Sequence, residues 1–192
     1  MQERRSFETL SPREVVTGPV QEADAQGEEE PATGPAEGPR RGLATLFIAL
    51  AAATTVVVAD QVTKSLAESR LEAGPVHVLG PLYFNLQYNT GSAFSLLTGW
   101  APLLVVVALV LVGVLAVLAW RTRRPGVALA LGLVLGGALG NLTDRLVRSH
   151  HGAVVDFIDF RFWPTFNLAD ASIVIGLVLL AIQLLRSGRG AH

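Results

Sequence analysis

The chain has 192 residues, of which 51% are hydrophobic and only 16% are charged, and its formal net charge is −1. A soluble domain normally carries a larger share of charged residues, so this composition indicates a membrane protein. The chain contains no cysteine. Disulfides, thiolate nucleophiles and zinc–thiolate sites are therefore excluded.

The first 42 residues differ in composition from the rest of the chain. They hold nine of the 16 acidic residues and are rich in Glu, Gly, Pro and Ala. So few large apolar side chains cannot offset the loss of chain entropy on folding, and we expect residues 1–42 to be a disordered acidic tail. The first apolar run begins only at Leu43. We expect this run to stay in the protein as a transmembrane helix, since a cleaved signal peptide would begin much earlier.

Four segments are apolar over the roughly 17 to 25 residues that a spanning helix needs. They cover residues 43–63, 100–120, 126–146 and 168–185. The arginines that flank them are Arg40, Arg41, Arg121, Arg123, Arg124, Arg186 and Arg189. By the positive-inside rule, the N-terminal tail, the short middle loop and the C-terminal residues 187–192 are cytoplasmic. The predicted fold is a mainly α membrane protein whose membrane domain, residues 43–186, has four transmembrane helices.

The loops 65–99 and 147–167 are then extracytoplasmic. The stretch "HVLGPLYFNLQYNTGSAFSLL" alternates apolar and polar residues around Leu82 to Tyr88 and contains turn residues, which predicts a small β-structure. The stretch "GAVVDFIDFRFWPTFN" also has a strand-then-turn pattern, and its aromatic residues suit a membrane interface. Together the two loops are expected to form a β-cradle or lid.

Unusual polar residues gather at the outer ends of the predicted helices. A rise of about 1.5 Å per residue gives each side chain a depth in the membrane. The residues placed near the outer surface in this way are Asp60, Lys64, Asn141, Asp144, Arg145 and Asp170. Ionisable groups in membrane helices usually mark a functional site, so this convergence predicts a site at the extracytoplasmic surface.

Two carboxylates suggest the chemistry of that site. Asp170 lies at a helix N-terminus, where the helix dipole favours a charged carboxylate, and Asp156 lies in the apolar, strand-like "VVDF". If the fold brings them together, repulsion leaves one protonated and one charged. Such a pair can activate water and protonate a peptide leaving group, without a covalent intermediate or a metal. Asp159 competes with Asp156 for this role, and spacing alone does not choose between them.

Five ordered motifs of this sequence closely resemble those of the bacterial lipoprotein signal peptidase, or signal peptidase II, family. They are "DQVTK" (60–64), "NTGSAF" (89–94), "GGALGNLTDRL" (136–146), "VVDF" (154–157) and "FNLAD" (166–170). The likeness spans residues 43–186, and five motifs in order are far more specific than any one of them. The resemblance implies an aspartic endopeptidase of the bacterial plasma membrane that removes signal peptides from prolipoproteins. It would cut just before a diacylglyceryl-modified cysteine.

Carried over residue by residue, the resemblance favours Asp156 over Asp159 and implies a catalytic dyad of Asp156 and Asp170. The supporting motif positions that it implies are Asp60, Lys64, Asn89, Gly91, Asn141, Asp144, Arg145, Asn167 and Ala169. The implied partners are diacylglyceryl-modified prolipoproteins and membrane lipid. No metal, cofactor or nucleic acid is expected, and we expect a monomer because the sequence has no obvious dimerisation signal.

Structural roles are an alternative for several of these residues. Asn167 and Asp170 have the spacing and side chains of residues that cap a helix N-terminus, and Asn89 with Gly91 suits a tight turn.

Ion pairing is a second structural alternative. Asp60 and Lys64 are one helical turn apart, and Asp144 can pair with Arg148 in the same way. The consecutive residues His150 and His151 are expected to lie in a solvated loop, and not in a metal site or beside a serine nucleophile.

Two other functional classes remain open from the residues alone. A proton or ion transporter would use paired intramembrane carboxylates, but its charges would line a path to the cytoplasm. A structural or assembly subunit would explain the ion pairs, but it offers no reason for two further aspartates beside an apolar groove.

Overall fold

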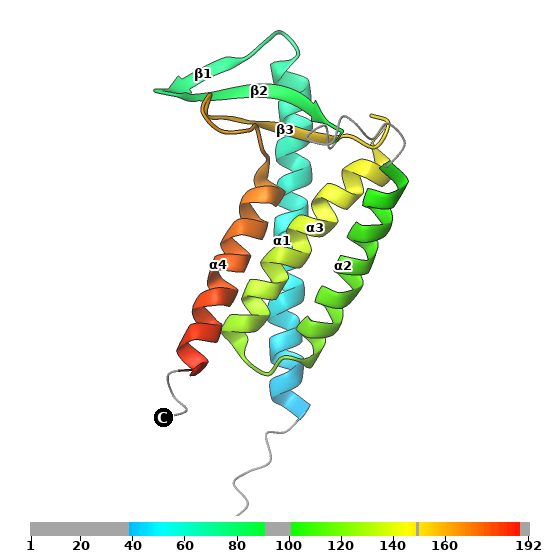
Figure 1. Cartoon of the computed structure of the whole chain (residues 1–192), viewed down its shortest axis with the longest axis vertical. Helices are drawn as coiled ribbons and strands as arrows, with labels where there is room; N and C mark the ends of the chain where they lie inside the picture. The colour runs from blue at the N-terminus through cyan, green and yellow to red at the C-terminus, as the bar shows by residue number, and fades with distance from the viewer. Residues whose placement is uncertain (1–38, 91–100, 149, 189–192) are drawn as a thin grey trace, which may run out of the picture. The chain divides into compact units, whose positions relative to one another are not determined.

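The computed structural model describes residues 39–90, 101–148 and 150–188. Most of the predicted acidic tail and Gly91 lie outside these residues. The secondary structure elements, in chain order, are α1 (Pro39–Leu71), β1 (Val76–Leu79), β2 (Leu82–Asn89), α2 (Ala101–Arg121), α3 (Pro125–Val147), β3 (Val154–Asp159) and α4 (Leu168–Gly188). The chain is mainly helical, with one small sheet (Figure 1).

Three described helices are long and apolar enough to cross a membrane: Gly42–Leu71, Pro125–Val147 and Leu168–Ser187. Helix α2 contributes a shorter apolar helical stretch, Val105–Arg121. The helices expose large apolar side chains along their flanks, such as Phe47 on α1 and Val174 on α4. This surface is suited to contact with lipid tails.

Helix α1 continues beyond the apolar segment expected to end at residue 63. It reaches Leu71, so the first part of the predicted external loop is helical. The added sequence "SLAESRL" consists mostly of good helix formers, which lets the helix extend past its apolar part.

Helix α3 lies at the centre of the bundle and packs against α1, α2 and α4. Its glycines allow this close packing. A Cβ atom at Gly136 would come within 2.8 Å of the Ala53 carbonyl oxygen of α1, and one at Gly137 within 2.4 Å of the Ala169 carbonyl oxygen of α4. Small residues are typical of membrane helices whose backbones approach closely.

The three strands form an antiparallel sheet in the order β1-β2-β3. The sheet confirms the β-structure predicted for the two loops. In the register of β2 with β3, Gln87 pairs with Asp156 and Asn89 with Val154. The sheet lies across the end of the helices where α3 ends and α4 begins (Figure 1).

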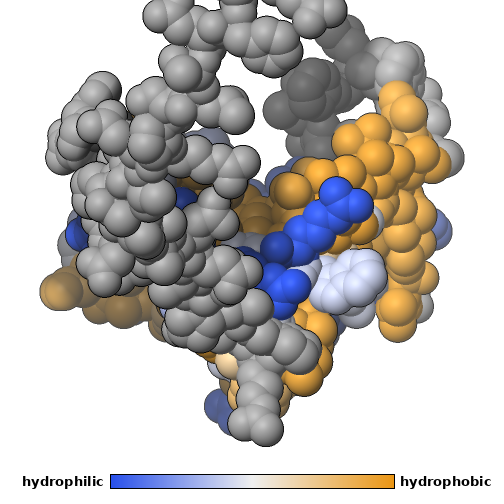
Figure 2. All heavy atoms as spheres, turned by 90° about the horizontal axis from the view of Figure 1, so that it is seen from below, coloured by the Kyte–Doolittle hydropathy of each residue, from blue (hydrophilic) through white to orange (hydrophobic). Residues whose placement is uncertain are grey.

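The opposite end of the bundle is seen in Figure 2, where hydrophilic side chains lie beside an apolar flank. The Thr45 hydroxyl of α1 donates to the Thr122 carbonyl of the α2–α3 connection, at 3.0 Å. Arg124 of the same connection contacts Ser187 near the end of α4. The start of α1, the short loop and the end of α4 therefore share this end.

Candidate active site

Strand β3 places Asp156 among polar side chains beneath the sheet. The residue is 2% exposed. The side-chain amide of Asn89 donates to its Oδ2 at 2.9 Å, and the amide of Asn167 donates to its Oδ1 at 2.7 Å. Both carboxyl oxygens thus accept a hydrogen bond from another element of the fold.

Asp170 lies in the first turn of α4 and is held in a similar way. Its Oδ1 accepts from the side-chain amide of Asn141 on α3 at 2.8 Å, and its Oδ2 accepts the backbone N–H of Asn167 at 3.3 Å. The backbone N–H of Asp170 donates in return to Asn167 Oδ1 at 2.9 Å. The capping interaction predicted for these two residues is therefore present, and it leaves the carboxylate beside Asn141.

Asn167 brings the two aspartates into one network, since its side chain touches both Asp156 and the backbone of Asp170. Burial raises the pKa of Asp156 to about 6. The amide of Asn89 opposes this rise in pKa, and the negative charge of Asp170 adds to it. Asp156 thus favours its protonated form more than an exposed carboxyl would, within a network that it shares with Asp170 through Asn167.

Asp159 has different surroundings. It lies three residues after Asp156, and side chains an odd number of residues apart point to opposite faces of a strand. Its Oδ1 accepts the backbone N–H of Arg161 at 2.7 Å, and its Oδ2 accepts from Asn85 at 3.2 Å. The Arg161 N–H is the main reason that the pKa of Asp159 lies below its usual value. The structure thus brings Asp156, and not Asp159, into the network of Asp170.

A buried ionic cluster lies directly beneath the two aspartates. The Lys64 ammonium is 2.8 Å from Asp60 Oδ2, 2.8 Å from Asp144 Oδ2 and 3.0 Å from Asn141 Oδ1. The side chains of Lys64, Asp60 and Asp144 are fully buried. Asp60 and Lys64 form the pair expected from their spacing, and α3 adds the second carboxylate.

The remaining predicted positions surround this cluster. Ala169 donates its backbone N–H to Asp60 Oδ1 at 3.0 Å. Arg145 donates to the Asn141 carbonyl at 3.3 Å, and its positive charge interacts favourably with the nearby carboxylates. Of the predicted supporting positions, all but Gly91 lie within the described residues, and the structure gathers them at one end of α1, α3 and α4.

Glu68, beside the site, was missed in the sequence, whereas the ion pair of Asp144 with Arg148 was expected from their helical spacing and is present. Arg148 reaches from the end of α3 to Asp144 Oδ1 at 3.2 Å and to Glu68 on α1. His150 Nε2 lies 2.7 Å from Glu68, and its ring packs against Tyr88 at a tilt of 40° with ring centroids 4.3 Å apart, so it is not simply a solvated loop residue. The sequence did contain a signal for Glu68, because this residue lies one helical turn after Lys64 and so on the same helix face. The signal could be used only if α1 extends beyond residue 63, which was not expected.

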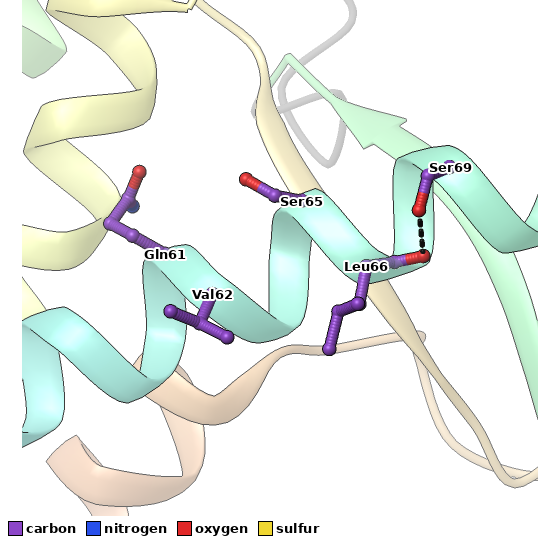
Figure 3. A pocket seen from close by; sticks show the side chains of 5 residues that line it. All are labelled: Gln61, Val62, Ser65, Leu66 and Ser69. Atoms are coloured by element: carbon purple, nitrogen blue, oxygen red, sulfur yellow. Dashed lines mark hydrogen bonds between the residues drawn. The ribbon is translucent and has the colours of Figure 1, made fainter.

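Two hollows lie near the C-terminal end of α1. Figure 3 shows a shallow groove along the helix, lined by Gln61, Val62, Ser65, Leu66 and Ser69. An apolar pocket of about 250 Å³ lies between α1 and the sheet and is lined by Thr63, Leu66, Ala67, Arg70, Leu71, Phe84 and Phe157. Phe157 directly follows Asp156, so an apolar cavity adjoins the strand that carries the acid. Among the described residues, His, Asp and Glu form no group of three or more arranged to hold a metal ion.

These features define a multi-pass membrane enzyme: apolar helices, a small sheet over one end of them and an enclosed cluster of acidic side chains. The sequence matches the family described as "Signal peptidase (SPase) II" over residues 52–186. The chain belongs to this family and is therefore a hydrolase, an aspartic endopeptidase of the signal peptidase II type.

Curated relatives agree with this assignment. The chain is 43% identical over 168 residues to the lipoprotein signal peptidase of Mycolicibacterium smegmatis, covering 82% of this chain and 70% of that one. It is 42% identical over 164 residues to that of Mycobacterium avium, covering 80% and 87%. The solved structure of a bacterial membrane enzyme is similar to this chain, with a TM-score of 0.65 and 30% identity over 71% of this chain and 92% of that one.

Proposed function

We propose that this protein removes signal peptides from prolipoproteins, cutting just before a diacylglyceryl-modified cysteine, and that Asp156 and Asp170 activate the attacking water. The observation that carries the proposal is the shared network of the two carboxyl groups, which come from β3 and α4 and meet through Asn167. The names of the relatives support the substrate class. The apolar pocket beside β3 offers a surface that suits a lipid chain.

The environments of the two acids suggest different roles. Asp170, in the first turn of α4, takes the role of the base that accepts a proton from water. Asp156, with its raised pKa, carries the proton that passes to the carbonyl oxygen of the scissile peptide as water attacks the carbonyl carbon. When the tetrahedral diol collapses, Asp170 returns its proton to the leaving nitrogen. Asp156 then recovers a proton from the diol, which restores the starting state.

The same proposal includes a topology. Helix α2 would be the fourth span, and both chain termini would be cytoplasmic in the bacterial plasma membrane. The support is that the arginine-rich α2–α3 connection lies beside the start of α1 and the end of α4, at the opposite end of the helices from the sheet. The aspartates would then lie at the extracytoplasmic surface. A signal peptide in the bilayer would present its cleavage site there.

The topology can be tested with single cysteines, because the chain has none of its own. Leu79 and Arg123 are both exposed, Leu79 in the sheet and Arg123 in the α2–α3 connection. A membrane-impermeant thiol reagent applied to intact spheroplasts should label Leu79→Cys at once. It should label Arg123→Cys only after permeabilisation. The reverse pattern would place the sheet in the cytoplasm and contradict the proposed orientation.

The activity can be tested with the purified full-length protein in lipid-containing micelles. Two prolipoprotein substrates of the same sequence would be compared, one with a diacylglyceryl-modified cysteine and one with a free cysteine. We expect cleavage of the modified substrate only, with mass spectrometry showing that the product begins at the lipidated cysteine. Equal cleavage of both would remove the lipid requirement. Failure to cleave either would overturn the proposed function.

A further inference from the structure

Lys64 makes more contacts than a simple ion pair requires. Its ammonium lies within 3.0 Å of three acceptors, and an ammonium has three N–H donors, so each donor has a partner. Enclosing this charge is costly even when it is paired, and buried ion pairs often add little net stability. Net stability alone therefore does not explain why Lys64 is enclosed here, and its three acceptors indicate what else it does.

The first acceptor holds the chain next to Asp156. Asp144 receives Lys64 on Oδ2, and the same oxygen accepts the backbone N–H of Val155 at 3.0 Å. Val155 directly precedes Asp156 in β3. Asp144 thus fixes the distance of β3 from α3 at the residue immediately before Asp156.

The second acceptor does the same for Asp170. Asp60 receives Lys64 on Oδ2, while its Oδ1 accepts the backbone N–H of Ala169 at 3.0 Å. Ala169 directly precedes Asp170 at the start of α4. The two carboxylates bound to Lys64 therefore hold the residues immediately before the two proposed catalytic acids.

The third acceptor acts on a side chain. A lysine ammonium can only donate, so the atom of Asn141 that faces Lys64 must be its amide oxygen. The amide nitrogen of Asn141 then points the other way and donates to Asp170 Oδ1 at 2.8 Å. The amide oxygen also accepts from Asn167, which donates to Asp156 as well. Lys64 thus sets the orientation of the amide that contacts Asp170.

We propose that Lys64 is a positioning residue of the peptidase reaction, tying the backbone before Asp156 and the backbone before Asp170 to one point and so setting the separation of the two carboxyl groups. The inference rests on the proposed function, in which these carboxyl groups activate water. Without the ammonium, Asp60 and Asp144 repel each other, and the Asn141 amide oxygen keeps only the donor from Asn167. A displacement of about 1 Å in a catalytic group costs roughly 10²-fold in rate.

The test uses the full-length protein and the lipidated substrate. Lys64→Met alone leaves two buried carboxylates without their shared cation and can fail to fold. The double variant Lys64→Met with Asp60→Asn removes one charge of each sign, and Asp144 keeps Arg148 at 3.2 Å. The asparagine that replaces Asp60 has a side-chain oxygen that can still accept the Ala169 N–H. Thr55→Val is the matched control on α1, because its hydroxyl bonds only within the helix, to the Ala51 carbonyl at 2.8 Å.

We expect the double variant to fold, to keep KM within about twofold and to lose roughly 10²-fold in kcat. The pH profile of kcat should also become narrower, because two acids held further apart influence each other less. Thr55→Val should match the wild type in all three measurements.

Asn141→Ala is a second test that leaves all three charges of the cluster in place. It should also narrow the pH profile, since Asp170 loses the N–H that the amide oriented by Lys64 donates to it. Wild-type kcat and an unchanged pH profile in either folded variant would overturn the positioning role. That result would leave the dyad intact, because the dyad is tested separately by substitution of the aspartates.

Discussion

Asp170→Asn is expected to lower the kcat for cleavage of the lipidated substrate by roughly 10²- to 10⁴-fold, the range typical of a lost general acid or base. Asparagine keeps the size of the side chain and can still accept one of the two N–H groups that Asp170 receives. It cannot take a proton from water. Asp156→Asn should have an effect of similar size, because asparagine has no carboxyl proton to give to the scissile carbonyl.

The matched control is Asp159→Asn, which changes a carboxylate on the same strand. Asp159 is bonded to Asn85 and to the backbone of Arg161, outside the network of Asp170. We expect this variant to keep kcat within about twofold of wild type. Full activity of Asp170→Asn or of Asp156→Asn, with normal insertion in the membrane, would remove that residue from the dyad.

The second large effect concerns stability. Burial raises the pKa of Asp156 from 3.8 to about 6, so the folded protein binds more protons here than the unfolded chain between these two values. The contribution of this group to stability is therefore complete below pH 3.8 and is lost as the pH rises through about 6. At 1.36 kcal/mol per pKa unit, the loss is about 3 kcal/mol.

Asp156→Asn removes this dependence on pH. The free energy of unfolding of the variant, measured against wild type with a chemical denaturant in micelles, should improve by about 2 kcal/mol between pH 4 and pH 7, since part of the full effect is already lost at pH 4. Any loss from an imperfect hydrogen bond to the asparagine is the same at each pH and does not alter this trend. An inactive variant that is more stable at neutral pH would fit the usual conflict between stability and activity.

Asp159→Asn serves here as a control of opposite sign. The pKa of Asp159 is lowered, mainly by the Arg161 N–H, so its carboxylate stabilises the fold above the unfolded pKa and this stabilisation is lost as the pH falls. Relative to wild type, Asp159→Asn should therefore become less stable as the pH rises. A parallel pH trend for the two variants would contradict the pKa directions given to the two aspartates.

Local patterns in the sequence were sufficient to predict much of the fold. Helix α4 was expected over residues 168–185 and extends from Leu168 to Gly188, and the small β-structure was expected from alternation near Leu82. These features depend on neighbours within a few residues, which hydropathy and periodicity record directly. The motif resemblance also predicted the family, and the family is confirmed.

The contacts between elements that are distant in the sequence could be identified only from the tertiary structure. From spacing alone, Asp156 and Asp159 were equal candidates, and the register of β3 with the start of α4 decides which one shares a network with Asp170. The sequence predicted the partner of Lys64 on its own helix, but not its contacts with Asp144 and Asn141 on α3. The physical reason is that local periodicity sets which face of an element is apolar or polar. Which faces meet, and at what height, is decided only when the helices pack against one another.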